Sequence, residues 1–406
     1  MLFNSPSFII FLPIVFILYY VLPYRFRRLL LLIASCIFYM AAIPKYIFIL
    51  FGLITVDYFL GIAIGNEKKD SRRFWLLVIS ICTNLGTLIF FKYFNFFNEN
   101  IALIAKFLDL NYSPVILNIL VPLGLSFHIF QSLSYVIEVY KKKYAPEKNY
   151  LNYALYVMFF PQLVAGPIER PQHLLPQISL NYDFNALKAR HGLERMLWGF
   201  FKKVVIADQI GQIINPYYAH MPSDGPLILI VIILFTYQIY CDFSGYSDIA
   251  LGTALLFGFE LRENFNRPFA AKTMAEYWHR WHMSLSGWLR DYLYYPLVIS
   301  WGKINKYKIH ISTLITLTLI GLWHGANWTF VIFGILHGLF LIIESLLQKP
   351  KIWIQKIFLK TKTMFVYNVL HTITLFTLIT IPLVFFRSKN IHDAWFMLSQ
   401  DRKSVV

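Results

Sequence analysis

Long uninterrupted apolar runs, separated by short polar or basic segments, occur along the whole chain. Most are long enough to cross the hydrocarbon core of a bilayer as a helix, which takes about 20 residues. None shows the period-two alternation that a transmembrane strand requires, and lipid admits only helices or closed barrels. The sequence therefore predicts an all-α, polytopic transmembrane protein, with spans at residues 7–23, 29–43, 46–65, 74–91, 114–140, 226–259 and 365–386.

Other stretches are apolar but short, amphipathic or unusually long. The run at 311–347 exceeds one span, so it holds either two spans or one tilted, broken helix. Residues 260–308 are more polar but rich in tryptophan, which is typical of an interfacial or re-entrant helix. With further segments at 95–113, 151–165 and 192–214, we expect roughly ten or eleven membrane segments. No internal repeat occurs, so residues 1–406 are expected to form one membrane domain.

Composition and charge agree with a membrane protein of defined orientation. Hydrophobic residues make up 58% of the 406 positions and charged residues only 14%, and the formal net charge is +16. Alternating spans place three basic clusters on one side, and cytoplasmic loops are the ones enriched in Lys and Arg. We therefore expect an extracytoplasmic N-terminus, a retained first span rather than a signal peptide, and contact with anionic lipid rather than nucleic acid. The clusters are Arg25, Arg27 and Arg28; Lys68, Lys69, Arg72 and Arg73; and Lys141, Lys142 and Lys143.

His324 is the first candidate for chemistry, because an ionisable residue inside an apolar run is costly to bury. It lies near the middle of the most apolar stretch of the C-terminal half, in the sequence GLWHGANW at 321–328. A histidine titrates near neutral pH and can accept a proton from a hydroxyl. Gly321 and Gly325 leave room beside it. On residue type alone, a packing histidine is an equal alternative, and we interpret His337 as support or packing.

A second candidate is the sequence WHRWH, which carries His279 and His282. On a helix, side chains three residues apart point within about 60° of each other, so this pair could hold a metal. Zinc sites require further ligands, and neither an HExxH motif nor a nearby cysteine is present. We therefore predict no metal site. The cysteines are expected to pack within apolar runs, at Cys36, Cys82 and Cys241.

Polar residues also gather at 240–248, in the sequence YCDFSGYSD. They fit either a capped helix boundary or the polar lining of a substrate passage. Neither a Gly-rich phosphate loop nor a serine nucleophile elbow occurs in the chain.

Four long stretches together resemble a known family. They are MFFPQLVAGPIERP at 158–171, YCDFSGYSDIALGT at 240–253, ENFNRPFAAKTMAEYWHRWHMSLSGWLRDYLYYPLV at 263–298 and GLWHGANWTFVIFGILHGL at 321–339. With the N-terminal segment they cover nearly the whole chain. The chain resembles the membrane-bound O-acyltransferases, specifically the bacterial branch typified by the alginate O-acetyltransferase membrane subunit.

This resemblance implies roles for particular residues. His324, in the WHG motif, matches the histidine regarded as catalytic in the family, and His282 matches the second active-site position. Both are implied to line a tunnel through the membrane domain, with His282 on a re-entrant element. His324 would act as general base toward an acceptor hydroxyl, while His282 orients the thioester carbonyl or stabilises its developing charge. Arg280 and Arg290 are the expected contacts to the acyl donor.

The resemblance also implies the reaction partners. The expected donor is cytoplasmic acetyl-CoA, with no permanently bound cofactor. The expected acceptor is an extracytoplasmic polysaccharide such as an alginate-like exopolysaccharide, reached with a periplasmic SGNH-type acetyltransferase partner. The expected location is the bacterial inner membrane.

Two departures from the family pattern keep alternatives open. Val298-Ile299-Ser300 stands where a Gly-rich turn is usual, and the chain ends 20 residues after Phe386, where relatives usually continue. We therefore expect a C-terminal span or two to be missing. The alternatives are D-alanyl transfer to teichoic acid, a transporter of an acylated or anionic solute, and an inactive subunit of a polysaccharide export complex.

Overall fold

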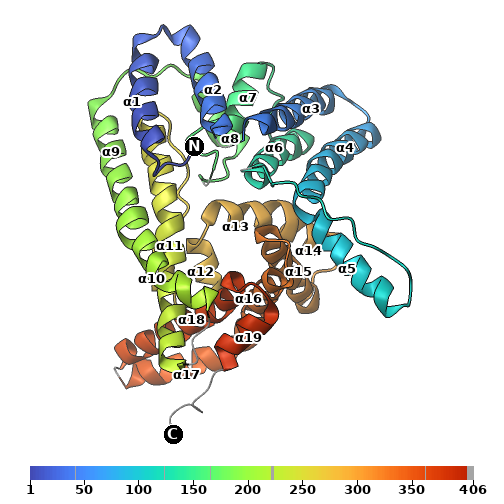
Figure 1. The fold of residues 1–406 in the computed structure, drawn as a ribbon, viewed down its shortest axis with the longest axis vertical. Helices are drawn as coiled ribbons and strands as arrows, with labels where there is room; N and C mark the ends of the chain where they lie inside the picture. Colours follow the sequence, from blue (N-terminus) through green and yellow to red (C-terminus); the bar gives the residue numbers. More distant parts are fainter. Residues whose placement is uncertain (42, 123, 165, 221–223, 362, 400–406) are drawn as a thin grey trace. The chain divides into compact units, whose positions relative to one another are not determined.

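The computed structural model describes residues 1–41, 43–122, 124–164, 166–220, 224–361 and 363–399. Every regular element within these ranges is helical, which confirms the all-α prediction (Figure 1). The contacts divide the chain into two compact units. Unit 1 contains residues 1–201 and 245–262, and unit 2 contains residues 202–244 and those from 263 onward. A single membrane domain stays a prediction.

Unit 1 carries the N-terminal helices. Its cores are formed by large apolar side chains of α1, α2, α3, α6 and α7, many of them fully buried. The elements are α1 (Pro6–Val21), α2 (Tyr24–Met40), η1 (Pro44–Tyr46), α3 (Ile47–Asn66), α4 (Asp70–Leu88), the π-helical turn η2 (Ile89–Tyr93), α5 (Phe94–Phe107), α6 (Leu125–Tyr140), α7 (Tyr150–Met158), α8 (Pro171–Ser179) and α9 (Ala186–Phe200).

Unit 2 carries the candidate chemistry. The long helix α11 (Gly225–Leu256) begins in unit 2 and ends in unit 1. The other elements are the π-helical turn η3 (Phe201–Ala207), α10 (Asp208–Ala219), η4 (Pro268–Ala270), α12 (Met274–Arg280), α13 (Met283–Leu289), the π-helical turn η5 (Arg290–Tyr294), α14 (Tyr295–Ser300), α15 (Lys306–His324), α16 (Trp328–Leu346), α17 (Gln348–Lys360), α18 (Met364–Arg387) and α19 (Ile391–Ser399).

Five helical segments of the described chain are long and apolar enough to cross a membrane. They are Pro44–Asn66, Asp70–Phe107, Gly225–Leu256, Trp328–Leu346 and Met364–Arg387. The apolar helix α1 is shorter than these five. The predicted spans at 46–65, 226–259 and 365–386 coincide with α3, α11 and α18 within a few residues. The total of ten or eleven membrane segments stays a prediction.

Two predicted boundaries are wrong. The span expected at 114–140 begins only at Leu125, because residues 110–122 are not helical; Pro114 and Pro122 lack the backbone N–H that a helix interior needs. The first basic cluster is not a loop but the first turn of α2, which begins at Tyr24. Arg27 is accommodated there because it donates hydrogen bonds to the carbonyl oxygens of Leu22 and Tyr182.

The apolar run at 311–347 forms two helices, α15 and α16, which pack side by side in Figure 1. Gly325 leaves the helical conformation, and the Asn327 side chain caps α16 by accepting a hydrogen bond from the Thr329 amide. Gly321 and Gly334 allow close backbone contact. A Cβ at Gly321 would lie 2.1 Å from the Phe330 carbonyl oxygen, and one at Gly334 would lie 2.2 Å from that of Leu317. Small residues at such contacts are typical of helix packing in membranes.

Candidate active site

His282 lies at the junction between α12 and α13. The helix α12 ends at Arg280, and His282 then adopts the left-handed conformation, with φ 44° and ψ 53°. A non-glycine residue in this region costs about 1–2 kcal/mol and persists only where its surroundings impose it. The helical expectation for the histidine pair is therefore wrong: His279 and His282 do not share a helix. His279 instead pairs with the Ala275 carbonyl oxygen, at 2.8 Å from Nδ1.

Asn264 holds this junction from a different part of the chain. The Asn264 Oδ1 accepts hydrogen bonds from the Ser284 amide at 3.2 Å and from the Ser284 hydroxyl at 2.9 Å. The Asn264 carbonyl oxygen also accepts one from the Met283 amide, at 2.9 Å. Normally the N-cap residue supplies such a bond from its own side chain. Here the Asn264 side chain accepts that bond in place of His282. The His282 imidazole is therefore not used to cap α13.

The His282 imidazole is buried among aromatic rings. The His282 side chain is only 1% exposed. Its ring centroid lies 4.6 Å from that of Phe243 and 6.2 Å from that of Trp323. Burial lowers the pKa of His282, which lies outside the five candidate spans, well below the usual histidine range, and His324 lowers it further. His282 is therefore neutral at neutral pH, and it is close enough to His324 for their charges to interact.

His324 is the last residue of α15, at the break within the apolar stretch 311–347. Its ring centroid lies 4.8 Å from that of Trp323, 5.0 Å from that of Phe386 and 5.8 Å from that of Phe333. Unlike His282, His324 is partly exposed. Trp323 thus contacts both histidines. An imidazole at a partly accessible position can accept a proton from a substrate, so the arrangement suits a proton-transfer reaction.

His337 sits on α16 and is 1% exposed. Its ring centroid lies 4.7 Å from that of Phe333, one turn earlier on the same helix, and Phe333 also contacts His324. The His337 ring further packs on Tyr277 and Trp278 of α12, with centroids 6.3 Å and 5.1 Å away. These contacts agree with the packing interpretation, because they support the helix that leads to His282.

The two predicted donor contacts have different surroundings. Arg280 pairs with Glu276 one helical turn earlier, at 2.7 Å. Arg290 pairs with the adjacent Asp291 at 3.2 Å, and both of these side chains are close to half exposed. Within the described residues, no group of three or more His, Cys, Asp or Glu side chains could hold a metal ion.

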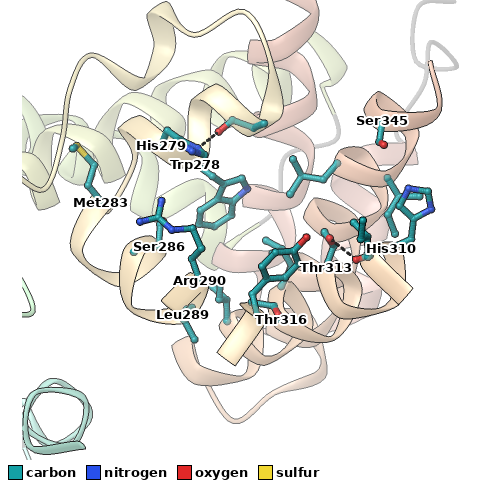
Figure 2. Close-up of a pocket in the computed structure, with 18 residues that line it drawn as sticks. Trp278, His279, Met283, Ser286, Leu289, Arg290, His310, Thr313, Thr316 and Ser345 are labelled. Atoms are coloured by element: carbon teal, nitrogen blue, oxygen red, sulfur yellow. Dashed lines mark hydrogen bonds between the residues drawn. The ribbon is translucent and has the colours of Figure 1, made fainter. Parts of the chain in front are cut away.

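A cavity of about 510 Å³ lies beside this region in unit 2 (Figure 2). Its walls come from α12, α13, η5, α15 and α16, and its lining is mainly apolar. Arg290, Met283 and Ser286 line it, whereas neither His282 nor His324 does. Within the described chain, Trp278 Nε1 and Thr316 Oγ1 are buried without a hydrogen-bond partner, and both residues line the cavity. Figure 2 shows Trp278 and Arg290 facing Thr313 and His310 across it.

The polar residues at 240–248 are not a helix boundary, because α11 continues to Leu256. In unit 2, Asp242 pairs with Lys203 of η3 at 2.6 Å, and the Ser244 hydroxyl accepts a hydrogen bond from Lys202 at 3.1 Å. Their neighbour Phe243 contacts His282. Sequence reasoning missed Phe243, Trp323 and Asn264 as site residues, although all three lie within the stretches that carry the family resemblance.

Comparison with known proteins agrees with the geometry. Residues 147–387 match the model of the membrane-bound O-acyltransferase family, MBOAT. The chain is 39% identical over 406 residues to a "Probable alginate O-acetylase AlgI" of Azotobacter vinelandii, covering 98% of this chain and 77% of that protein. It is 33% identical to a "Peptidoglycan O-acetyltransferase" of Helicobacter pylori, covering 97% and 78%. A "Teichoic acid D-alanyltransferase" of Streptococcus thermophilus is 31% identical over 56% of this chain and 58% of its own length.

These matches define an O-acyltransferase enzyme with a helical, multi-pass membrane domain. The chain belongs to the membrane-bound O-acyltransferase family.

Proposed function

We propose that this enzyme moves an acetyl group from cytoplasmic acetyl-CoA toward an extracytoplasmic polysaccharide. The observation that carries the proposal is the convergence of His282 and His324 on Trp323, from two separate helix junctions. The partly exposed histidine suits a base that must reach its substrate. The buried, neutral histidine suits a group that must hold the substrate in a fixed orientation. We assign His324 as the base and His282 as the orienting group.

In the proposed step, His324 accepts the proton of the acceptor hydroxyl as its oxygen attacks the thioester carbonyl carbon. The carbon–sulfur bond breaks, and the coenzyme A thiolate leaves and takes up a proton. His282 stabilises the charge that develops on the carbonyl oxygen, which requires a donor held in place before the reaction. The aromatic rings that bury His282 exclude water from that side of the site, which limits hydrolysis of the acetyl group. We propose that both histidines line a tunnel through the membrane domain.

We place the donor in the cavity lined by Arg290. Its mainly apolar wall and the unpartnered Trp278 Nε1 and Thr316 Oγ1 suit a pantetheine arm, which has both apolar and amide groups. Arg290, on its rim, would contact the anionic end of coenzyme A. Arg280 is the weaker candidate, because it does not line this cavity and is paired with Glu276 at 2.7 Å.

The acceptor is proposed as an extracytoplasmic glycan, on the names of relatives that align over nearly the whole chain. An alginate-like exopolysaccharide is the first candidate. A periplasmic SGNH-type acetyltransferase completes the transfer in this proposal. The enzyme would lie in the bacterial inner membrane with its N-terminus extracytoplasmic. D-Alanyl transfer is the second candidate, and it is favoured by shorter alignments only.

The test is a transfer assay with the purified protein in lipid vesicles, its SGNH-type partner on the extracytoplasmic side, and acetyl-CoA labelled in the acetyl group. We expect the label to become covalently bound to an added glycan acceptor. Intact labelled acetyl-CoA inside the vesicles would instead indicate a transporter. Chemical analysis of the polymer from cells that express the protein separates acetyl from D-alanyl esters, and D-alanyl esters alone would overturn the choice of donor.

A further inference from the structure

A second cavity in unit 2 lies apart from both histidines, between α16, α17 and α18. Its volume is about 450 Å³, and its walls are almost entirely apolar. Phe340 and Ile343 of α16 face Leu375 and Leu378 of α18 across it. Because α16 and α18 are both candidate membrane spans, an apolar cleft between them suits a hydrocarbon chain.

The mouth of this cleft is basic. Lys272, which precedes α12, and Lys351, on α17, both line it. The one carboxylate in the lining, Glu344, already has three partners. Its side chain pairs with Lys351 at 3.0 Å and accepts hydrogen bonds from the Met274 amide at 2.9 Å and the Ala275 amide at 3.3 Å.

A second carboxylate, Glu276, accepts a hydrogen bond from the Lys272 amide at 2.7 Å and pairs with Arg280 at 2.7 Å. At this end of the cleft, the three cations Lys272, Lys351 and Arg280 therefore exceed the two carboxylates by one charge.

The helix α17 has the character of an interfacial helix. Lys349, Lys351 and Lys356 alternate along it with large apolar side chains. Trp353 and Leu359 are 66% and 55% exposed. A helix with both exposed apolar side chains and several lysines lies at the surface of a membrane, where anionic headgroups attract it. It joins two candidate spans, so it also sits at the level where a headgroup would be found.

We propose that this cleft is a binding site for one anionic phospholipid. An acyl chain lies between α16 and α18, and the phosphate contacts Lys272 and Lys351. The occupant is a phospholipid because the cleft combines a hydrocarbon-sized apolar slot with two cations at one end. This proposal does not depend on the acetyl-transfer proposal. The two regions are connected only where Glu344, in the cleft lining, accepts hydrogen bonds from the first turn of α12.

The experiment uses the full-length protein in a neutral detergent, titrated with dioleoylphosphatidylglycerol or dioleoylphosphatidylcholine. Native mass spectrometry measures the first bound lipid. We expect the wild-type protein to prefer phosphatidylglycerol by roughly tenfold or more, because lysines near an anionic headgroup attract it. Equal affinity for the two lipids would overturn the proposal.

Variants locate the site. The Lys272→Gln/Lys351→Gln protein should lose most of this preference, and glutamine keeps a hydrogen-bond donor near Glu344. The exposed change Lys303→Gln is the matched control and should preserve the preference.

Ile343→Trp, which fills the cleft, should weaken the binding of both lipids, whereas Leu339→Trp, on the same helix outside the cleft lining, should not. If the double lysine variant keeps its preference, or Ile343→Trp binds normally, the site is not this cleft. Lys272→Gln alone, at an exposed position, gives the same test should the double variant fail to fold.

Discussion

Two helix junctions each hold one of the candidate histidines, and they hold it in different ways. At the α12–α13 junction, the backbone of His282 is left-handed and the ring is buried. Its helix is capped by Asn264, from outside the junction. At the α15–α16 junction, His324 stays helical and partly exposed, and the next helix is capped from within by Asn327. The first junction holds the His282 side chain in one buried position, while the second leaves the His324 side chain accessible to a substrate. The two histidines therefore suit different roles.

The largest effect expected at the first junction comes from the His282 ring itself. His282→Ala and His282→Gly both remove the imidazole, and each should reduce the rate of acetyl transfer by about 10²–10³. Glycine adopts the left-handed conformation without cost, so His282→Gly should unfold at a higher temperature than His282→Ala. Transfer rates and thermal unfolding in detergent measure both effects. A His282→Gly enzyme with wild-type activity would show that the ring has no role.

At the second junction, the close contact at Gly321 is the sensitive point. In Gly321→Ala, the new Cβ would lie 2.1 Å from the Phe330 carbonyl oxygen. Forcing the helices apart should destabilise the protein by about 1–3 kcal/mol and displace His324, with a loss of activity. Gly52→Ala on α3 is the control, because nothing lies within 4 Å of the new Cβ, and it should leave stability unchanged or slightly raised. Thermal unfolding that is unchanged in Gly321→Ala would mean that the two helices do not need this contact.

Removing the Asn264 cap of α13 should reduce the rate of acetyl transfer less than these changes. Asn264→Ala removes the acceptor for Ser284, and a lost cap costs about 1 kcal/mol. We expect kcat to fall about fivefold while KM for acetyl-CoA stays near the wild-type value. Asn264→Asp keeps the acceptor and should restore most of kcat. If Asn264 acts by positioning His282, Asn264→Ala should lower kcat no further in a His282→Ala background; an equal further loss would assign it a purely structural role.

The smallest expected effect is on KM for acetyl-CoA, and it should differ between variants of Arg290 and Arg280. Arg290→Gln should raise KM for acetyl-CoA several-fold, because a charge-assisted contact to the donor contributes about 1 kcal/mol at a partly exposed site. Arg280→Gln should change KM little, because Arg280 does not line the proposed donor cavity. Steady-state kinetics at varied acetyl-CoA measure both. The opposite ranking would place the donor nearer α12 than the Arg290 cavity.

The sequence predicted the helices where hydrophobic length was decisive. The apolar runs located α3, α11 and α18 because a span needs about 20 apolar residues. They failed at 110–122, since Val115 and Ile116 are as apolar in an extended segment as in a helix. They also could not choose between one broken helix and two at 311–347, because Gly325 is tolerated inside many helices. The packing of α15 against α16 shows that this run forms two helices.

The site was predictable only through the family motifs. Those motifs singled out His324 and His282, and the structure brings both to Trp323. Neither the left-handed backbone of His282 nor its cap by Asn264 follows from any local pattern. Both depend on hydrogen bonds between segments about 20 residues apart in the chain, which periodicity and motif spacing do not encode.

The central claim is that His324 performs the proton transfer that acetylation requires. The most direct measurement compares wild-type and His324→Ala proteins, both inserted in vesicles together with the SGNH-type partner, for transfer of labelled acetyl groups from acetyl-CoA to a glycan. General-base catalysis contributes about 10²–10⁴ to the rate, so we expect the variant to fall to background while its membrane insertion and thermal unfolding are preserved. A His324→Ala protein that transfers label at the wild-type rate would contradict the claim.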